Sequence, residues 1–168
     1  MTDPTSLPNF PQPAAENPLR DTVIDVLQGE GFRPEVDGDG DVSFKIEGQQ
    51  LFVHCTEGEL PVVRVFGQWQ IADNLPSDPL TQLRAANDLS LRLNIVKAGI
   101  NGGTLVVTCE HIVHPGADVR QLIQLSYQLV LTAVQMWHQL MLGEDVFGDG
   151  SGRAAQNGEA GPVAPGQG

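Results

Sequence analysis

The amino-acid sequence predicts an α+β domain in which helices pack against an antiparallel five-stranded sheet. Short segments alternate apolar and polar residues between turn residues, which is typical of half-buried strands. Other segments repeat apolar residues every three or four positions, which is typical of amphipathic helices. The turns that join successive strands are too short for parallel crossovers. The predicted order of elements is therefore α-β-β-β-α-β-β-α.

Composition places this domain in the middle of the chain. The chain has 168 residues and is 40% hydrophobic, which is enough for one domain of ordinary size. Residues 1–16 are rich in proline, and residues 143–168 consist mostly of Gly, Ala, Gln and Pro. Neither end contains enough apolar residues to offset the entropy of ordering. We therefore expect one domain over residues 17–142 between two disordered tails.

The net charge of the chain is −12 at pH 7. Such acidity argues against binding to nucleic acid or to an anionic membrane, because both repel a negative protein. The N-terminus has no basic patch followed by an apolar run, so we expect no signal peptide, and the 2 cysteines predict no disulfide framework. We expect a cytoplasmic protein without a cofactor.

The first half of the chain predicts one helix and three strands. Asn17-Pro18 is a typical helix start, and alternation then predicts strands over residues 42–46, 51–55 and 62–70. The acidic segment 37–41 could be a calcium loop, but Val42 and Gly48 stand where such a loop needs glycine and glutamate. A tight turn between strands fits this segment better.

A central helix is predicted to begin at Ser77-Asp78-Pro79, because Asp accepts first-turn amide hydrogens and Pro suits the first helical position. The helix has two apolar sides, so it is expected either to lie between a sheet and another helix or to be shared with a second subunit. Asn87 and Asn94 fall on one of these leucine-rich sides. We expect them to be buried and hydrogen-bonded as structural polar residues.

Two further strands and a long helix complete the predicted domain. Asn101-Gly102-Gly103 predicts a hairpin turn between two strands, and the helix is expected over residues 117–142. One side of this helix carries amides where an acidic protein would normally expose charged residues. That uncharged side predicts a partner-binding or dimer interface, made of Gln121, Gln124, Gln128, Gln135 and Gln139 with Tyr127 beside them.

An enzyme or a metal-binding protein is the alternative class. Two cysteines and three histidines lie on or next to predicted strands and could together bind a metal ion. They are Cys55, Cys109, His54, His111 and His114. Their spacing matches no known pattern of ligand pairs, and both cysteines fall where small buried residues are expected. The sequence contains no nucleophile elbow, phosphate loop or His-Glu-x-x-His motif. We therefore predict no catalytic or metal-ligating residue.

The order of elements resembles the type III secretion chaperone fold and, more closely, the bacterial YbjN domain. The matching features are Gly31-Phe32 before the first strand, the 37–41 turn followed by alternating Val42-Ser-Phe44, Asn87 and Asn94 in the second helix, and Thr104-Leu-Val-Val after a glycine turn. The resemblance spans about residues 18–142. It implies a non-enzymatic and often dimeric protein, either a sensory-transduction regulator or a secretion-chaperone-like domain.

Together these observations predict a non-catalytic cytoplasmic module that binds another protein, with a regulatory or chaperone-like role. The module is expected to act as a homodimer through a helix and sheet surface. The sequence does not identify the partner.

Overall fold

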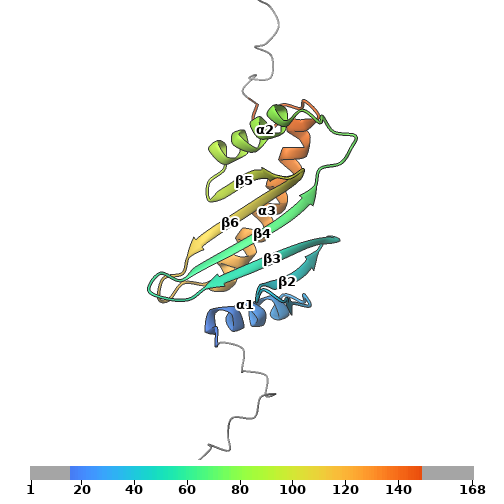
Figure 1. Cartoon of the computed structure of the whole chain (residues 1–168). Helices are drawn as coiled ribbons and strands as arrows, with labels where there is room; N and C mark the ends of the chain where they lie inside the picture. The colour runs from blue at the N-terminus through green and yellow to red at the C-terminus, as the bar shows by residue number, and fades with distance from the viewer. Residues whose placement is uncertain (1–15, 149–168) are drawn as a thin grey trace, which may run out of the picture.

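The structure is a computed structural model that describes residues 16–148 (Figure 1). Its elements follow one another along the chain as α1 (Pro18–Gly29), β1 (Glu35–Val36), β2 (Val42–Ile46), β3 (Gln49–Thr56), β4 (Val62–Gln70), α2 (Pro79–Arg92), β5 (Val96–Asn101), β6 (Thr104–Ile112) and α3 (Val119–Met141). The α+β class and the three predicted helices are confirmed.

The sheet is antiparallel with the strand order β1-β2-β3-β4-β6-β5. It has six strands, so the prediction of five was wrong. The additional strand is β1, whose two residues pair with Ser43 and Val42 of β2. The turn between these strands is fixed by Asp37, whose Oδ1 accepts the backbone N–H groups of Asp39 (2.9 Å) and Asp41 (3.0 Å). A two-residue strand is too short to show alternation, so sequence periodicity could not reveal it.

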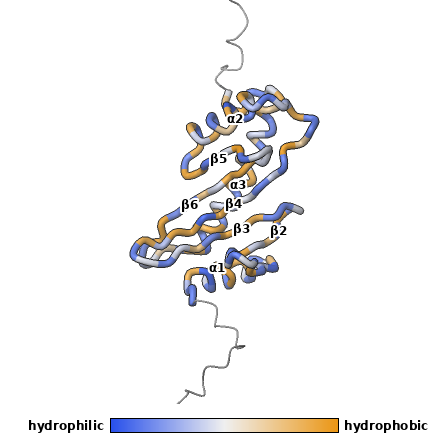
Figure 2. Tube along the Cα trace, in the orientation of Figure 1, coloured by the Kyte–Doolittle hydropathy of each residue, from blue (hydrophilic) through white to orange (hydrophobic). Residues whose placement is uncertain are grey.

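The helices pack against one face of the sheet (Figure 1). The long helix α3 contacts β4, β5 and β6, α1 contacts β2 and β3, and α2 lies by β5 at the other end of the sheet. Apolar and polar residues alternate along the strands (Figure 2), so that Val63 and Val65 of β4 are fully buried while Arg64 between them is exposed. The opposite face carries a stacked pair, Phe52 and Phe66, with ring centroids 5.3 Å apart.

One hydrophobic core lies between the sheet and the helices. Tyr127 of α3, Phe32 and Phe44 form an aromatic cluster inside it, with centroid distances of 5.3 to 6.2 Å. Tyr127 is therefore buried, and its predicted place on an interaction surface was wrong. Its position between Phe32 and Phe44 explains this, because the ring fills the end of the core near α1.

The helix α2 begins as predicted, with Asp78 as its N-cap and Pro79 in the first turn. The Asp78 side chain accepts the backbone N–H of Thr81 at 2.9 Å. Near the other end, Ser90 Oγ accepts the backbone N–H of Ala98 on the edge strand β5 at 2.9 Å. This contact matters because a buried edge N–H without a partner would cost about 1–3 kcal/mol.

The prediction that Asn87 and Asn94 are buried was wrong, because both side chains are exposed. The helix α2 buries its other apolar side instead, through Ala85, Ala86 and Leu89. The leucines that share a side with Asn87 are exposed as well: Leu80 by 54%, Leu83 by 50% and Leu91 by 76%. We call Leu80, Leu83, Asn87 and Leu91 the outer face of α2.

The described chain continues past the domain boundary that we expected at Leu142. Phe147 is partly buried against the core, and the Arg92 guanidinium lies 4.7 Å from the centre of its ring. The predictions about the tails fall mostly on residues 1–15 and 149–168, which lie outside the described residues. None of the helices within residues 16–148 is long and apolar enough to cross a membrane.

Candidate functional site: a glutamine-lined groove

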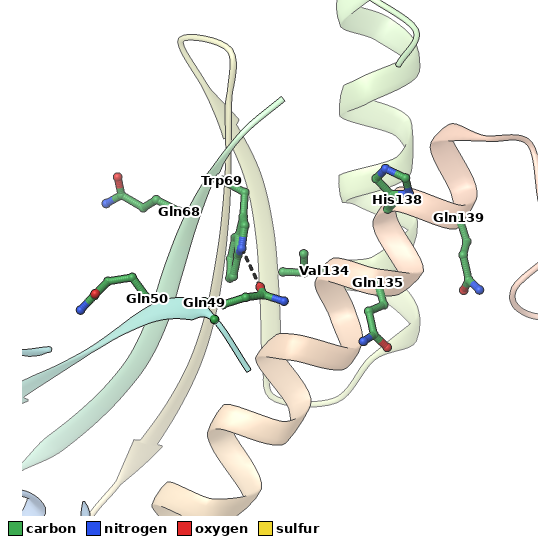
Figure 3. A pocket seen from close by; sticks show the side chains of 9 residues that line it. Gln49, Gln50, Gln68, Trp69, Val134, Gln135, His138 and Gln139 are labelled. Atoms are coloured by element: carbon green, nitrogen blue, oxygen red, sulfur yellow. Dashed lines mark hydrogen bonds between the residues drawn. The ribbon is translucent and has the colours of Figure 1, made fainter. Parts of the chain in front are cut away.

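A groove of about 640 Å³ lies between α3 and the strands β3 and β4 (Figure 3). It is lined by Gly48, Gln49, Gln50, Gln68, Trp69, Val134, Gln135, His138 and Gln139. We call these nine residues the glutamine groove. Its volume lies within the roughly 300–1,000 Å³ of ordinary ligand sites.

The sheet supplies one wall of the groove. Gln49 and Gln50 follow the turn at Gly48, and Gln68 and Trp69 lie near the end of β4. Trp69 Nε1 donates a hydrogen bond to Gln49 Oε1 at 2.8 Å, which joins the two strands through their side chains (Figure 3). The indole therefore presents its apolar ring to the groove while its polar N–H is already satisfied.

The other wall is the C-terminal half of α3. This part of the helix presents one apolar side chain, one imidazole and two amides to the groove. They belong to Val134, His138, Gln135 and Gln139, respectively. The helix is held in place by Trp137, which is buried beneath this surface and donates through Nε1 to the backbone oxygen of Gln82 in α2 at 3.4 Å.

The chemistry of the groove follows from its lining. It contains five glutamines, one tryptophan and none of the Asp, Glu, Lys or Arg residues that give the chain its charge. A glutamine amide both donates and accepts hydrogen bonds, as a peptide group does. The groove is thus suited to an uncharged ligand that carries many amide groups.

The predicted glutamine surface is only partly brought together. Gln135 and Gln139 line the groove, whereas Gln121 and Gln128 are exposed nearer the start of α3 and Gln124 is half-buried. The groove residues of the sheet, Gln49, Gln50, Gln68 and Trp69, were not predicted from the sequence. Their signal was a cluster of uncharged amides around a tryptophan, at the start of β3 and the end of β4.

The cysteines and histidines do not form the alternative site. Within residues 16–148, no group of three or more His, Cys, Asp or Glu side chains could hold a metal ion. His54 of β3 pairs with Asp41, with 2.6 Å between His54 Nδ1 and Asp41 Oδ1. Cys109 and His111 both lie on β6, with 3.6 Å between the Cys109 thiol and His111 Nε2. Burial raises the pKa of the Cys55 thiol to about 12 and also raises the pKa of Cys109. Both cysteines are therefore protonated at neutral pH and are poor nucleophiles.

The comparisons with known proteins place the chain in a class of chaperone-like peptide-binding domains. Residues 17–140 match the family model described as "TY-Chap1: T3SS (YopN, CesT) and YbjN peptide-binding chaperone 1". The chain belongs to this family, which is one of chaperone-like peptide-binding domains and not a known enzyme family. The predicted YbjN resemblance is thereby confirmed.

A solved structure shows the same fold. The crystal structure of YbjN from E. coli is similar to this chain with a TM-score of 0.54 and 15% sequence identity. The similarity covers 71% of this chain and 89% of the YbjN chain. The comparison with curated proteins finds no match.

Proposed function

We propose that this protein is a chaperone-like or regulatory module that binds an uncharged peptide segment of a partner protein in the glutamine groove. The observation that carries the proposal is the lining of the groove, in which five amides surround Trp69 without any Asp, Glu, Lys or Arg. Family membership supports a peptide as the ligand. In a chain with a net charge of −12, such a lining favours uncharged segments and leaves binding nearly independent of salt.

The test is binding of the full-length protein to an array of short synthetic peptides. The array contains an uncharged set built from Val, Thr, Ser and Gln, and acidic and basic sets in which Glu or Lys replaces Gln. We expect the uncharged set to bind, with little change in affinity between low and moderate salt. Binding of only the basic set, lost as salt rises, would contradict the proposal because it would reflect the overall negative charge.

A matched pair of variants locates the binding site. Gln135→Glu with Gln139→Glu should weaken binding of the best uncharged peptide by roughly tenfold, because two amide donors are lost. Gln121→Glu with Gln128→Glu adds the same charge to exposed positions of the same helix outside the groove, and should leave the affinity unchanged. An equal effect of both pairs would place the peptide elsewhere.

The proposal also includes a homodimer. The outer face of α2 exposes Leu80, Leu83 and Leu91, and a two-fold axis could cover this face with its own copy. The apolar character of that surface supports a dimer, and the family resemblance noted above points the same way. We further propose that the protein acts in the cytoplasm, which agrees with its acidic composition.

A further inference from the structure

The sheet has one face that no helix of the described chain covers. Figure 1 shows this face in front, with α3 behind the strands. The stacked rings of Phe52 and Phe66 lie on its central strands β3 and β4, and both side chains are only half-buried. We call this surface the open face of the sheet.

The open face gathers positive charge in an acidic molecule. The chain has 21 acidic and 9 basic residues, yet strands β2 to β6 contain three basic residues and only one acidic residue. The register of the sheet places all four on the same side as the phenylalanine pair, because directly paired residues share a face and so do alternate residues of one strand. They are Lys45 and Lys97, which are both lysines of the chain, together with Arg64 and Glu110.

Glu110 holds two of these cations in place. Its carboxylate accepts hydrogen bonds from Arg64 Nε at 2.7 Å and from Lys97 Nζ at 2.6 Å. The Glu110 side chain is only 22% exposed, whereas those of Arg64 and Lys97 are 47% and 67% exposed. Another carboxylate near this surface, that of Asp41, is paired with His54. A ligand on the open face therefore meets mainly positive charge, which favours an acidic ligand.

The aromatic pair discriminates between two kinds of acidic ligand. Proteins that bind single-stranded nucleic acid stack the bases on exposed ring faces. The rings of Phe52 and Phe66 lie at an interplanar angle of 22° with their centroids 5.3 Å apart, so each ring turns one face toward the other ring. The pair offers ring edges and apolar surface, which suit an apolar or aromatic side chain. An acidic protein segment therefore fits the open face better than a nucleic acid does.

We propose that the open face binds an acidic segment of a partner protein. The carboxylates of the segment are bound by the three cations, and an aromatic side chain of the segment packs on the phenylalanine pair. This inference goes beyond the proposed function and does not depend on it, because an uncharged ligand and an acidic ligand need different surfaces. The two surfaces adjoin where Gln50, which lines the glutamine groove, pairs with Lys45 in the sheet.

The positions of the two lysines set the spacing of the acidic residues. Lys45 lies on β2 and Lys97 on β5, with β3, β4 and β6 between these strands. Neighbouring strands are about 4.8 Å apart, so the two lysines are separated by roughly 20 Å. An extended segment advances about 3.3 Å per residue, which places its outer acidic residues roughly six positions apart, with the aromatic residue near the middle. Such a segment runs across the strands and contacts them through side chains.

The test measures binding of the full-length protein to a labelled synthetic peptide by fluorescence anisotropy. The peptide carries a central phenylalanine between two Glu-Asp pairs that are roughly six positions apart. We expect it to bind at low salt and to bind more weakly as salt rises. Two matched peptides, one with Ala in place of Phe and one with Gln-Asn in place of each Glu-Asp pair, should each bind at least roughly tenfold more weakly.

A matched pair of variants locates the surface. Lys45→Gln with Lys97→Gln should weaken binding of the acidic peptide by roughly tenfold. Arg84→Gln with Arg92→Gln removes the same charge from exposed positions of α2 and should leave the affinity nearly unchanged.

Three outcomes would refute the proposal. The first is no binding of the acidic peptide at low salt, and the second is an equal loss in both variants, which would reflect net charge alone. The third is binding of a single-stranded oligonucleotide through the two lysines without binding of the acidic peptide. The uncharged peptides of the array test the proposed function separately, so either proposal can fail while the other stands.

Discussion

The indole of Trp69 occupies the space where a side chain at Gly67 would lie. A Cβ atom placed on Gly67 would come within 2.2 Å of the indole ring and within 2.8 Å of a methyl group of Leu51. Gly67 thus allows the ring to fold back over its own strand and to reach Gln49 of β3. The absence of a Cβ atom at Gly67 therefore leaves room for the Trp69 ring, which lines the glutamine groove.

Gly67→Ala should destabilise the protein by about 1–3 kcal/mol, because overpacking forces the indole or the strand to move. It should also change the fluorescence of Trp69. Gly99→Ala is the matched control, since Gly99 is also a strand glycine but a Cβ there would meet nothing within 4 Å. Urea denaturation measures both variants. Equal stability of the two would mean that the indole is not held against Gly67.

Much of the fold could be predicted because it depends on local chemistry. Asp78-Pro79 starts α2 by capping, and Asn101-Gly102-Gly103 turns between β5 and β6 through residues that tolerate positive φ. These signals involve only neighbouring residues, so they can be found without knowledge of tertiary contacts.

The groove and the orientation of α2 could not be predicted in the same way. A helical wheel shows which residues share a side but not which side meets the sheet, and α2 has two apolar sides. The side that contains Asn87 proved to be the exposed one. The groove joins residues of β3, β4 and α3, and only the register of the sheet brings Gln49 to Trp69.

Asn87→Leu and Asn94→Leu should each change the free energy of unfolding by no more than about 0.5 kcal/mol, because both side chains are exposed. Denaturant titration at low protein concentration is the measurement. A loss of about 1–3 kcal/mol would instead mean that the amides have buried hydrogen-bond partners.

Ser90→Ala should cost about 1–3 kcal/mol, because it leaves the backbone N–H of Ala98 without its partner between α2 and β5. Ser77→Ala, in the exposed loop before α2, removes the same hydroxyl group and should be nearly neutral. Thermal denaturation compares the two variants. Similar melting temperatures would show that the link between Ser90 and the strand contributes little.

The stability of the protein should fall in acid partly through Glu110. Its carboxylate accepts hydrogen bonds from Lys97 (2.6 Å) and Arg64 (2.7 Å), and the hydrogen bond from Lys97 is the main reason that its pKa lies below the ordinary 4.5. A carboxyl group whose pKa is lowered by folding contributes its full stabilisation at pH values above its pKa in the unfolded state. This contribution is lost as the pH falls through the pKa of the group in the folded state. Because these groups are partly exposed, the effect should be about 1 kcal/mol or less.

Glu110→Gln should therefore reduce the difference between the unfolding free energies at pH 7 and pH 3. Glu59→Gln removes the same charge from an exposed position between β3 and β4 and serves as the control. Urea titrations at both pH values provide the comparison. The prediction fails if the two variants show the same pH dependence as the unmodified protein.

Light scattering over a concentration series tests the proposed dimer. The mass should rise toward that of a dimer with concentration, and Leu83→Glu with Leu91→Glu should keep the protein monomeric by placing charges on the outer face of α2. Gln121→Glu with Gln128→Glu adds the same charge to α3 and should leave association unchanged. A monomeric mass for the unmodified protein at every concentration would rule out the dimer.

The most direct test of the glutamine groove is an NMR titration that follows the side-chain amide groups of glutamine in the full-length protein. When the best uncharged peptide is added, the account predicts shifts of the amide signals of Gln49, Gln50, Gln68, Gln135 and Gln139, which line the groove. The signals of Gln121 and Gln128, on the same helix but outside the groove, should stay in place. Shifts of Gln121 and Gln128 without shifts of the groove glutamines would contradict the account.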